Sequence, residues 1–305
     1  MKNTSVIEVK HLHKRYGDNV AVDDVSLTVD EGEILGILGR NGAGKTTTVE
    51  CIEGIRDPDR GEITVCGLDP RRDRAEVTRL LGVQLQDGRL PDRLRVDEAL
   101  QLYSSFYRDP ADWRGLMDAL GLASKARTRY GKLSGGQKQR LSIALALVGN
   151  PRVAILDELT TGLDPQARRD TWDLIEGVRS RGVTIVLVTH FMAEAERLCD
   201  RVALIDAGRV VTVDTPAGLA EQAHLGQRIQ FRPSGPLDDD LLTSLPEVTA
   251  VTRRGDLIIV DGTDDALAAV TAVLARHRIT AHRLRVEQAS LEDAFVELTT
   301  PTSER

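Results

Sequence analysis

Residues 39–46 form a glycine-rich segment, Gly-Arg-Asn-Gly-Ala-Gly-Lys-Thr, whose residue types suit phosphate binding. It follows an apolar run, Ile34 to Leu38, and precedes a helical pattern, which is the context that a phosphate-binding loop requires. The glycines would let the backbone approach phosphate closely, and the lysine would reach the β- and γ-phosphates of a nucleotide. The alternative is an ordinary glycine turn. The predicted ATP-binding residues of this loop are Gly39, Arg40, Asn41, Gly42, Ala43, Gly44, Lys45, Thr46 and Thr47, with Lys45 also catalytic and the Thr46 hydroxyl also a ligand of Mg²⁺.

Two acidic residues and a histidine follow other apolar runs of the chain. The run Val153 to Leu156 ends in Asp157 and Glu158, and adjacent carboxylates at the end of a core strand are unfavourable unless a cation or an activated water compensates them. We expect Asp157 to bind Mg²⁺ and Glu158 to orient or deprotonate an attacking water. His190 comes just after the run Thr184 to Val188, so it should lie at the same sheet edge. The alternatives are a solvated acidic pair and a structural histidine.

The pentapeptide Leu133-Ser134-Gly135-Gly136-Gln137 is a second glycine-rich element, nearly a hundred residues after the first. At the start of a helix it would offer backbone N–H groups and a hydroxyl to phosphate oxygens. One nucleotide seldom needs two such elements from one chain. The pattern therefore predicts a second phosphate-binding element.

Composition restricts the class of protein. The net charge is −7 and the 40 Lys and Arg residues are dispersed, which argues against a nucleic-acid partner. Three cysteines lie far apart without a C-x-x-C pair, which disfavours a zinc site or a disulfide framework and suits a reducing cytoplasm. The N-terminus lacks the apolar region of a signal peptide, and the longest apolar stretches are shorter than the roughly 18 to 20 residues of a spanning helix. A membrane role would therefore need a separate partner.

The elements that must position these residues divide the chain in two. From Val6 to about Leu219, short β-branched runs alternate with helical patterns, which predicts an α/β domain on a largely parallel sheet, residues 1–219, with a helical subdomain at about 92–149 that carries the pentapeptide. Residues 220–305 predict a small ferredoxin-like α+β domain of roughly βαββαβ order. Its predicted strands are Arg228 to Phe231, Val248 to Thr252, Leu257 to Val260 and Thr280 to Val286, with a helix from Asp265 to Ala275 and a last helix capped by Ser290 and Asp293.

With these residues in order, the chain resembles the nucleotide-binding subunit of an ATP-binding cassette (ABC) transporter, a P-loop NTPase, over Val6 to about Leu219. Leu133 to Gln137 resembles the signature sequence of that family, and Lys138-Gln139-Arg140 continues it. The resemblance implies that two copies pair head to tail and that the signature of one copy caps the ATP on the phosphate loop of the other. By that resemblance Ser134, Gly135, Gly136 and Gln137 act in trans.

Further roles follow from the resemblance alone. Tyr16 matches an aromatic residue that stacks on adenine, although a strand-end tyrosine can also be simple packing. Gln86 matches the glutamine that joins the magnesium site to the coupling helix of the membrane subunit. The resemblance therefore implies that Gln86 is a catalytic residue and a ligand of the metal. Gln84 is the alternative candidate for this role. Asp164 matches a loop that crosses the dimer near the catalytic glutamate. Leu159 departs from the proline of many members, which would only stiffen the loop, so we expect activity to be retained.

The segment Leu291 to Phe295 resembles the extension of the daunorubicin/doxorubicin-resistance branch of drug exporters, although a generic amphipathic helix would look similar. The resemblance implies an ATP-hydrolysing exporter subunit with ATP and Mg²⁺ as cofactors. It would lie on the inner face of the cell membrane, bound to separately encoded polytopic permeases, with a second copy of itself as partner. Two rivals stay open: a non-transport cassette ATPase acting on ribosomes or DNA, and an exporter of lipid, polysaccharide or ion. The first usually has two cassettes or a coiled-coil insertion, which this sequence lacks.

Overall fold

The computed structural model describes residues 4–84, 90–222, 226–288 and 290–299. The chain separates into two compact units, Met1–Thr215 and Pro216–Arg305. The division falls after Thr215, whereas the sequence pattern places it after Leu219. Helix α8 (Pro216–Gln222) accounts for the difference, because it packs against α11 (Leu291–Thr299) of the second unit.

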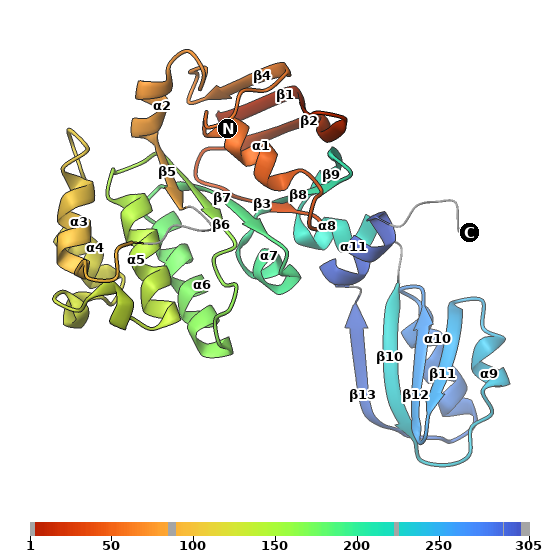
Figure 1. The fold of residues 1–305 in the computed structure, drawn as a ribbon. Coiled ribbons are helices and arrows are strands. Elements are labelled where there is room, and N and C mark those ends of the chain that lie inside the picture. The colour runs from red at the N-terminus through yellow and green to blue at the C-terminus, as the bar shows by residue number, and fades with distance from the viewer. Residues whose placement is uncertain (1–3, 85–89, 223–225, 289, 300–305) are drawn as a thin grey trace. The chain divides into compact units, whose positions relative to one another are not determined.

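A six-stranded sheet forms the centre of the first unit, in the order β5-β6-β7-β3-β8-β9 (Figure 1). The first five strands are parallel, and β9 runs antiparallel to β8. Every residue of β3 and β7 is buried, as expected for parallel strands covered on both faces. The strands are β3 (Ile34–Leu38), β5 (Leu81–Gln84), β6 (Val153–Asp157), β7 (Thr184–Thr189), β8 (Arg201–Asp206) and β9 (Arg209–Asp214).

The register of this sheet aligns the ends of its strands. Leu38 of β3 pairs with Thr189 of β7, and Val188 of β7 pairs with Asp157 of β6. The phosphate loop, the two acids and the histidine therefore leave the sheet at one edge. Helices α1 (Lys45–Ile52), α2 (Arg74–Leu80), α6 (Pro165–Arg179) and α7 (Met192–Leu198) connect the strands of this unit.

A separate antiparallel sheet, β2-β1-β4, was not expected from the sequence, which predicts a largely parallel arrangement. It consists of β1 (Ser5–Tyr16), β2 (Asn19–Asp30) and β4 (Arg60–Val65). The first two strands join through a tight turn that pairs Tyr16 with Asn19. A short turn permits only antiparallel pairing, so this hairpin cannot join the parallel sheet through a crossover.

Helices make up the segment that carries the pentapeptide. They are α3 (Val96–Ser104), α4 (Trp113–Ala119) and α5 (Gly135–Leu147), with short 3₁₀ turns at Ala123–Lys125 and Tyr130–Lys132. The pentapeptide ends one turn into α5, as the sequence predicts.

The second unit contains a four-stranded antiparallel sheet in the order β11-β12-β10-β13. Along the chain its elements are β10 (Gln227–Pro233), α9 (Asp240–Thr243), β11 (Val248–Arg254), β12 (Leu257–Gly262), α10 (Ala266–Arg276) and β13 (Ala281–Gln288). Phe231, Ile258 and Val270 belong to its core. The predicted cap of α11 is confirmed, because Asp293 N donates to Ser290 Oγ (3.2 Å) and Ser290 N donates to Asp293 Oδ2 (3.0 Å). Among the described helices of either unit, none is long and apolar enough to span a membrane.

Candidate nucleotide-binding site

The phosphate loop requires glycine at two crowded positions. Gly44 has φ 100°, and a Cβ atom there would lie 2.3 Å from the carbonyl oxygen of Ala21. A Cβ on Gly39 would lie 2.2 Å from the carbonyl oxygen of Ile205. The loop is therefore held against β2 and the end of β8 by backbone contacts that no other residue allows, which leaves its opposite side for a ligand.

Lys45 begins α1 with its side chain fixed over the loop. Its Nζ donates to the carbonyl oxygens of Gly39 (2.8 Å) and Arg40 (3.0 Å), and the residue is only 7% exposed. Burial lowers the pKa of this ammonium, while Glu158 and Asp157 act in the opposite direction. An incoming phosphate would give the buried cation a stronger partner than two neutral carbonyls.

Asp157 ends β6 in surroundings that favour its protonated form. Burial and then the neighbouring Glu158 raise the pKa of its carboxyl to about 6, although Lys45 acts to lower it. A bound divalent cation would stabilise the charged form of a carboxylate that burial and a neighbouring negative charge destabilise. Within the described residues no cluster of three or more His, Cys, Asp or Glu could hold a metal ion alone. Mg²⁺ fits nonetheless, because it is commonly held by one or two protein groups together with nucleotide phosphates.

Glu158 and His190 approach each other across two strand ends. His190 Nδ1 lies 3.3 Å from Glu158 Oε1, and Glu158 N donates to the carbonyl oxygen of Val188 (2.9 Å). Glu158 has φ 48°, an uncommon conformation for a residue with a side chain and one that is often found at functional sites.

An open pocket of about 510 Å³ collects most of the predicted residues. Gly39, Arg40 and Ala43 belong to the loop without lining the pocket. Two residues of β2, Asn19 and Ala21, line it and were not predicted, because nothing in their own sequence distinguishes them from ordinary strand residues. The lining residues are Tyr16, Asn19, Ala21, Asn41, Gly42, Gly44, Lys45, Thr46, Thr47, Asp157, Glu158 and His190.

Tyr16 presents a partly exposed ring at this pocket. The Nζ of Lys14 and the guanidinium carbon of Arg56 each lie 5.6 Å from the ring centroid. The residue is 38% exposed. A flat and accessible ring suits stacking against a nucleobase.

The signature residues and Asp164 do not line this pocket. Ser134 caps α5: its Oγ accepts from Gln137 N (3.3 Å), while its N donates to Gln137 Oε1 (3.1 Å). Asp164 caps α6 by accepting from the N–H groups of Gln166 (3.0 Å) and Ala167 (2.9 Å). Gln86 lies outside the described residues, and Gln84, the last residue of β5, does not line the pocket. The structure thus separates the second phosphate element from the first within one chain.

A stack beside His190 was also missed by sequence reasoning. The rings of His190 and Phe191 have centroids 4.1 Å apart, and the guanidinium carbon of Arg168 lies 4.7 Å from the Phe191 centroid. Arg168 follows Asp164 by one helical turn, so the stack connects the histidine to the first turns of α6. No pattern of spacing links residues 168 and 191.

Comparison with known proteins decides the family. Residues 22–161 match the family model described as ABC transporter. The Nod factor export ATP-binding protein I of Burkholderia pseudomallei (strain K96243) is 38% identical over 304 residues, which cover 96% of each chain. The chain belongs to the ABC transporter family. The protein of the same name from Burkholderia lata is 42% identical over 221 residues, 70% of this chain and 72% of the relative.

Solved structures of ABC cassettes agree with this assignment. The ATP-binding subunit of an ABC transporter is 30% identical, with a TM-score of 0.65, over 71% of this chain and 92% of that structure. A dimeric ATP-binding cassette in a post-hydrolysis state, bound to ADP and Pi, is 27% identical, with a TM-score of 0.62, over 68% of this chain and 98% of that chain. The present chain is therefore an ATPase that binds ATP with Mg²⁺, and it is the ATP-binding subunit of an ABC transporter.

Proposed function

We propose that this ABC transporter subunit hydrolyses ATP with Glu158 as the residue that orients and deprotonates the attacking water. The observation that supports this most directly is the meeting of Lys45, Asp157, Glu158 and His190 in one pocket. Lys45 would bind the β- and γ-phosphates, and Thr46 and Asp157 would hold Mg²⁺, with Gln86 as a further ligand. Bound Mg²⁺ supplies charge neutralisation at the phosphate oxygens.

His190 completes this arrangement of groups. Its Nδ1 already lies near Glu158 Oε1, so the histidine can hold the carboxylate in place and approach the γ-phosphate from the same sheet edge. Catalysis of phosphoryl transfer depends mainly on such positioning and on charge stabilisation. Tyr16 would stack on the adenine, as its accessible ring allows.

We further propose that two copies pair head to tail, so that Ser134, Gly135, Gly136 and Gln137 of one copy bind the ATP on the phosphate loop of the other. Support comes from the separation of the two phosphate elements in one chain and from the dimeric cassettes among the related structures. Asp164 would lie in the loop that crosses this dimer.

Export is the direction of transport that we propose, through separately encoded polytopic permeases that hold the subunit at the inner face of the membrane. The supporting relative covers 96% of this chain and is named for Nod factor export. The resemblance of Leu291 to Phe295 to drug exporters makes a drug or other hydrophobic compound the proposed cargo. A Nod factor is the second candidate, since it is named in the relatives.

We propose that residues 1–219 form an ATPase domain and that residues 220–305 form an accessory domain of ferredoxin-like fold. The strand order β11-β12-β10-β13 and the element order β-α-β-β-α-β support the ferredoxin-like assignment.

The test begins with purified protein and with membranes. We expect Mg²⁺-dependent phosphate release that Glu158→Gln removes, and co-purification of a polytopic membrane protein from cells that express the tagged chain. Inside-out vesicles that contain both proteins should then accumulate the cargo when ATP is added. Absence of any polytopic partner would contradict the exporter, while phosphate release alone would still support the ATPase.

A further inference from the structure

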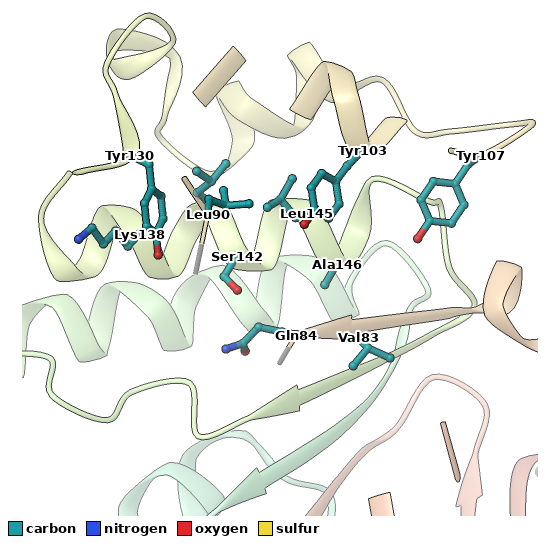
Figure 2. Close-up of a pocket in the computed structure, with 11 residues that line it drawn as sticks. Val83, Gln84, Leu90, Tyr103, Tyr107, Tyr130, Lys138, Ser142, Leu145 and Ala146 are labelled. Atoms are coloured by element: carbon teal, nitrogen blue, oxygen red, sulfur yellow. The ribbon is translucent and has the colours of Figure 1, made fainter. Parts of the chain in front are cut away.

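A second cavity, which we call the tyrosine cavity, lies at the β5 edge of the six-stranded sheet, and its residue Gln84 pairs with Leu156, which directly precedes Asp157 of the nucleotide pocket. Its volume is about 160 Å³. Figure 2 shows Val83 and Gln84 of β5 on one side, and the rings of Tyr103, Tyr107 and Tyr130 on the other, beyond α5. None of the lining residues is shared with the nucleotide pocket. Two lining residues, Gln84 and Lys138, lie in or beside sequence motifs, but the sequence did not predict a cavity between them.

Tyrosine is concentrated around it. The whole chain has four tyrosines, and three of them line this one cavity. Burial, with a smaller contribution from Tyr103, raises the pKa of the Tyr107 hydroxyl, so that ring is partly enclosed. Lys138 Nζ lies 5.0 Å from the centroid of Tyr130. Aromatic walls of this kind favour a flat aromatic guest, because rings pack well in offset and edge-to-face arrangements.

Several lining residues are polar, and among them Gln84 carries a buried acceptor without a partner. The residue is 6% exposed, and its Oε1 atom has no hydrogen-bond partner among the described residues. Its backbone is fixed, since Gln84 pairs with Leu156 in the β5–β6 ladder. A buried acceptor without a partner is unfavourable and is uncommon in folded proteins. A guest that donates a hydrogen bond would remove this penalty.

We propose that the tyrosine cavity binds one planar aromatic ring that carries a hydrogen-bond donor, of the phenol or indole class, and that Gln84 Oε1 accepts its hydrogen bond. The volume is sufficient, because a cavity of roughly 150 Å³ holds a benzene ring in another protein. Val83, Leu141 and Ala146 supply apolar surface for the ring. The guest is either a free small molecule or a tyrosine or tryptophan side chain of the membrane subunit, and the second source rests on the proposed function.

The test compares phenol with toluene, which has the same shape but no donor. Methyl resonances of Leu141 and Leu145 in the full-length chain would report binding of each probe. The substitution Gln84→Met keeps the volume of the side chain but removes the acceptor. We expect it to lower the affinity for phenol, relative to the affinity for toluene, by about 2- to 10-fold. Gln84→Met should also leave the melting temperature of the chain without ligand unchanged or higher, because the variant buries no unpaired acceptor.

The matched control is Gln139→Met. Gln139 also has a buried side-chain atom without a partner, Nε2, but it does not line the cavity. This variant should leave the ratio of the two affinities unchanged. Failure of phenol to shift the Leu141 and Leu145 resonances would overturn the proposal, and so would a phenol-to-toluene ratio that Gln84→Met does not change. Neither outcome depends on ATP hydrolysis, so both are distinguishable from a failure of the proposed function.

A last measurement separates the two sources. Phenol is titrated against the chain purified together with its membrane subunit. Loss of the phenol shifts in that complex would identify a side chain of the membrane subunit as the guest. Retention of the shifts would identify a free small molecule.

Discussion

Helices α1 and α5 both begin with glycines at a proposed phosphate site, yet the two starts differ. Gly44, the N-cap of α1, has φ 100°, and no side chain caps this helix in the described structure. At α5, Ser134 and Gln137 bond to each other's backbone N–H groups in a capping box. The first start leaves its N–H groups for a ligand, whereas the second is already stabilised within one chain.

The other end of α1 extends this difference. Glu53 is its C-cap, and burial, followed by Asp157 and Glu50, raises the pKa of that carboxyl to about 8. A negative charge is also unfavourable at a helix C-terminus. Helix α1 thus lacks a stabilising side-chain cap at its start and carries an unfavourable carboxyl at its end, while the start of α5 is capped by its own chain.

The largest expected effect tests the chemistry at the α1 site. Glu158→Gln should lower the rate of phosphate release by about 10²- to 10⁴-fold, the usual contribution of a general base. ATP binding and ATP-dependent dimer formation should persist, because the variant keeps the size of the side chain. Phosphate release, nucleotide titration and light scattering measure the three properties. Undiminished hydrolysis would remove Glu158 from the proposed role.

Ser134→Arg tests whether the α5 site acts on a partner copy. We expect the rate of phosphate release by the dimer to fall by about 10²- to 10³-fold, because the loss of one hydrogen-bond donor to a transition state usually has an effect of this size. ATP binding by the dilute monomer should be unchanged, since Ser134 does not line the pocket. The wild-type monomer is the control. Equal loss of binding and hydrolysis would show that the signature acts within its own chain.

Glu53→Gln tests the unfavourable carboxyl at the end of α1. Between the unfolded pKa of 4.5 and the folded value of about 8, the folded chain retains a proton that the unfolded chain releases. Stability without nucleotide or metal should therefore fall as pH rises through this window. Relative to the wild type, the variant should have a free energy of unfolding on the order of 2 kcal/mol higher at pH 8.5 and the same at pH 4.5. Urea unfolding at both pH values measures this, and a gain that does not depend on pH would refute the explanation.

The smallest effect concerns the cap of α5. Ser134→Ala should lower the free energy of unfolding by about 1 kcal/mol, because one helix-start N–H loses its acceptor. Asp164→Ala, which removes the cap of α6, is the matched comparison and should cost a similar amount. Thermal unfolding of the single chain is sufficient for both. A Ser134→Ala variant as stable as the wild type would mean that the capping box adds little to the stability of the chain. The starts of α1 and α5 would then differ less than we infer.

Much of the fold and of the nucleotide site followed from the sequence. Strand, loop and helix are contiguous around Lys45, so local patterns identified the phosphate loop directly. Parallel strands end at one edge, and this rule brought Asp157, Glu158 and His190 together although they are distant in the chain. The roles assigned to these residues stay predictions.

Tertiary structure alone decided the rest. Asn19 and Ala21 reach the nucleotide pocket because β2 of the hairpin packs against the loop. The stack of His190, Phe191 and Arg168 connects the segment after β7 to α6, and these two segments share no motif. The tyrosine cavity depends on packing among β5, α3 and α5. Local sequence specifies backbone conformation and the ends of strands, but cavities arise from how side chains of separate segments fill space, which no single segment encodes.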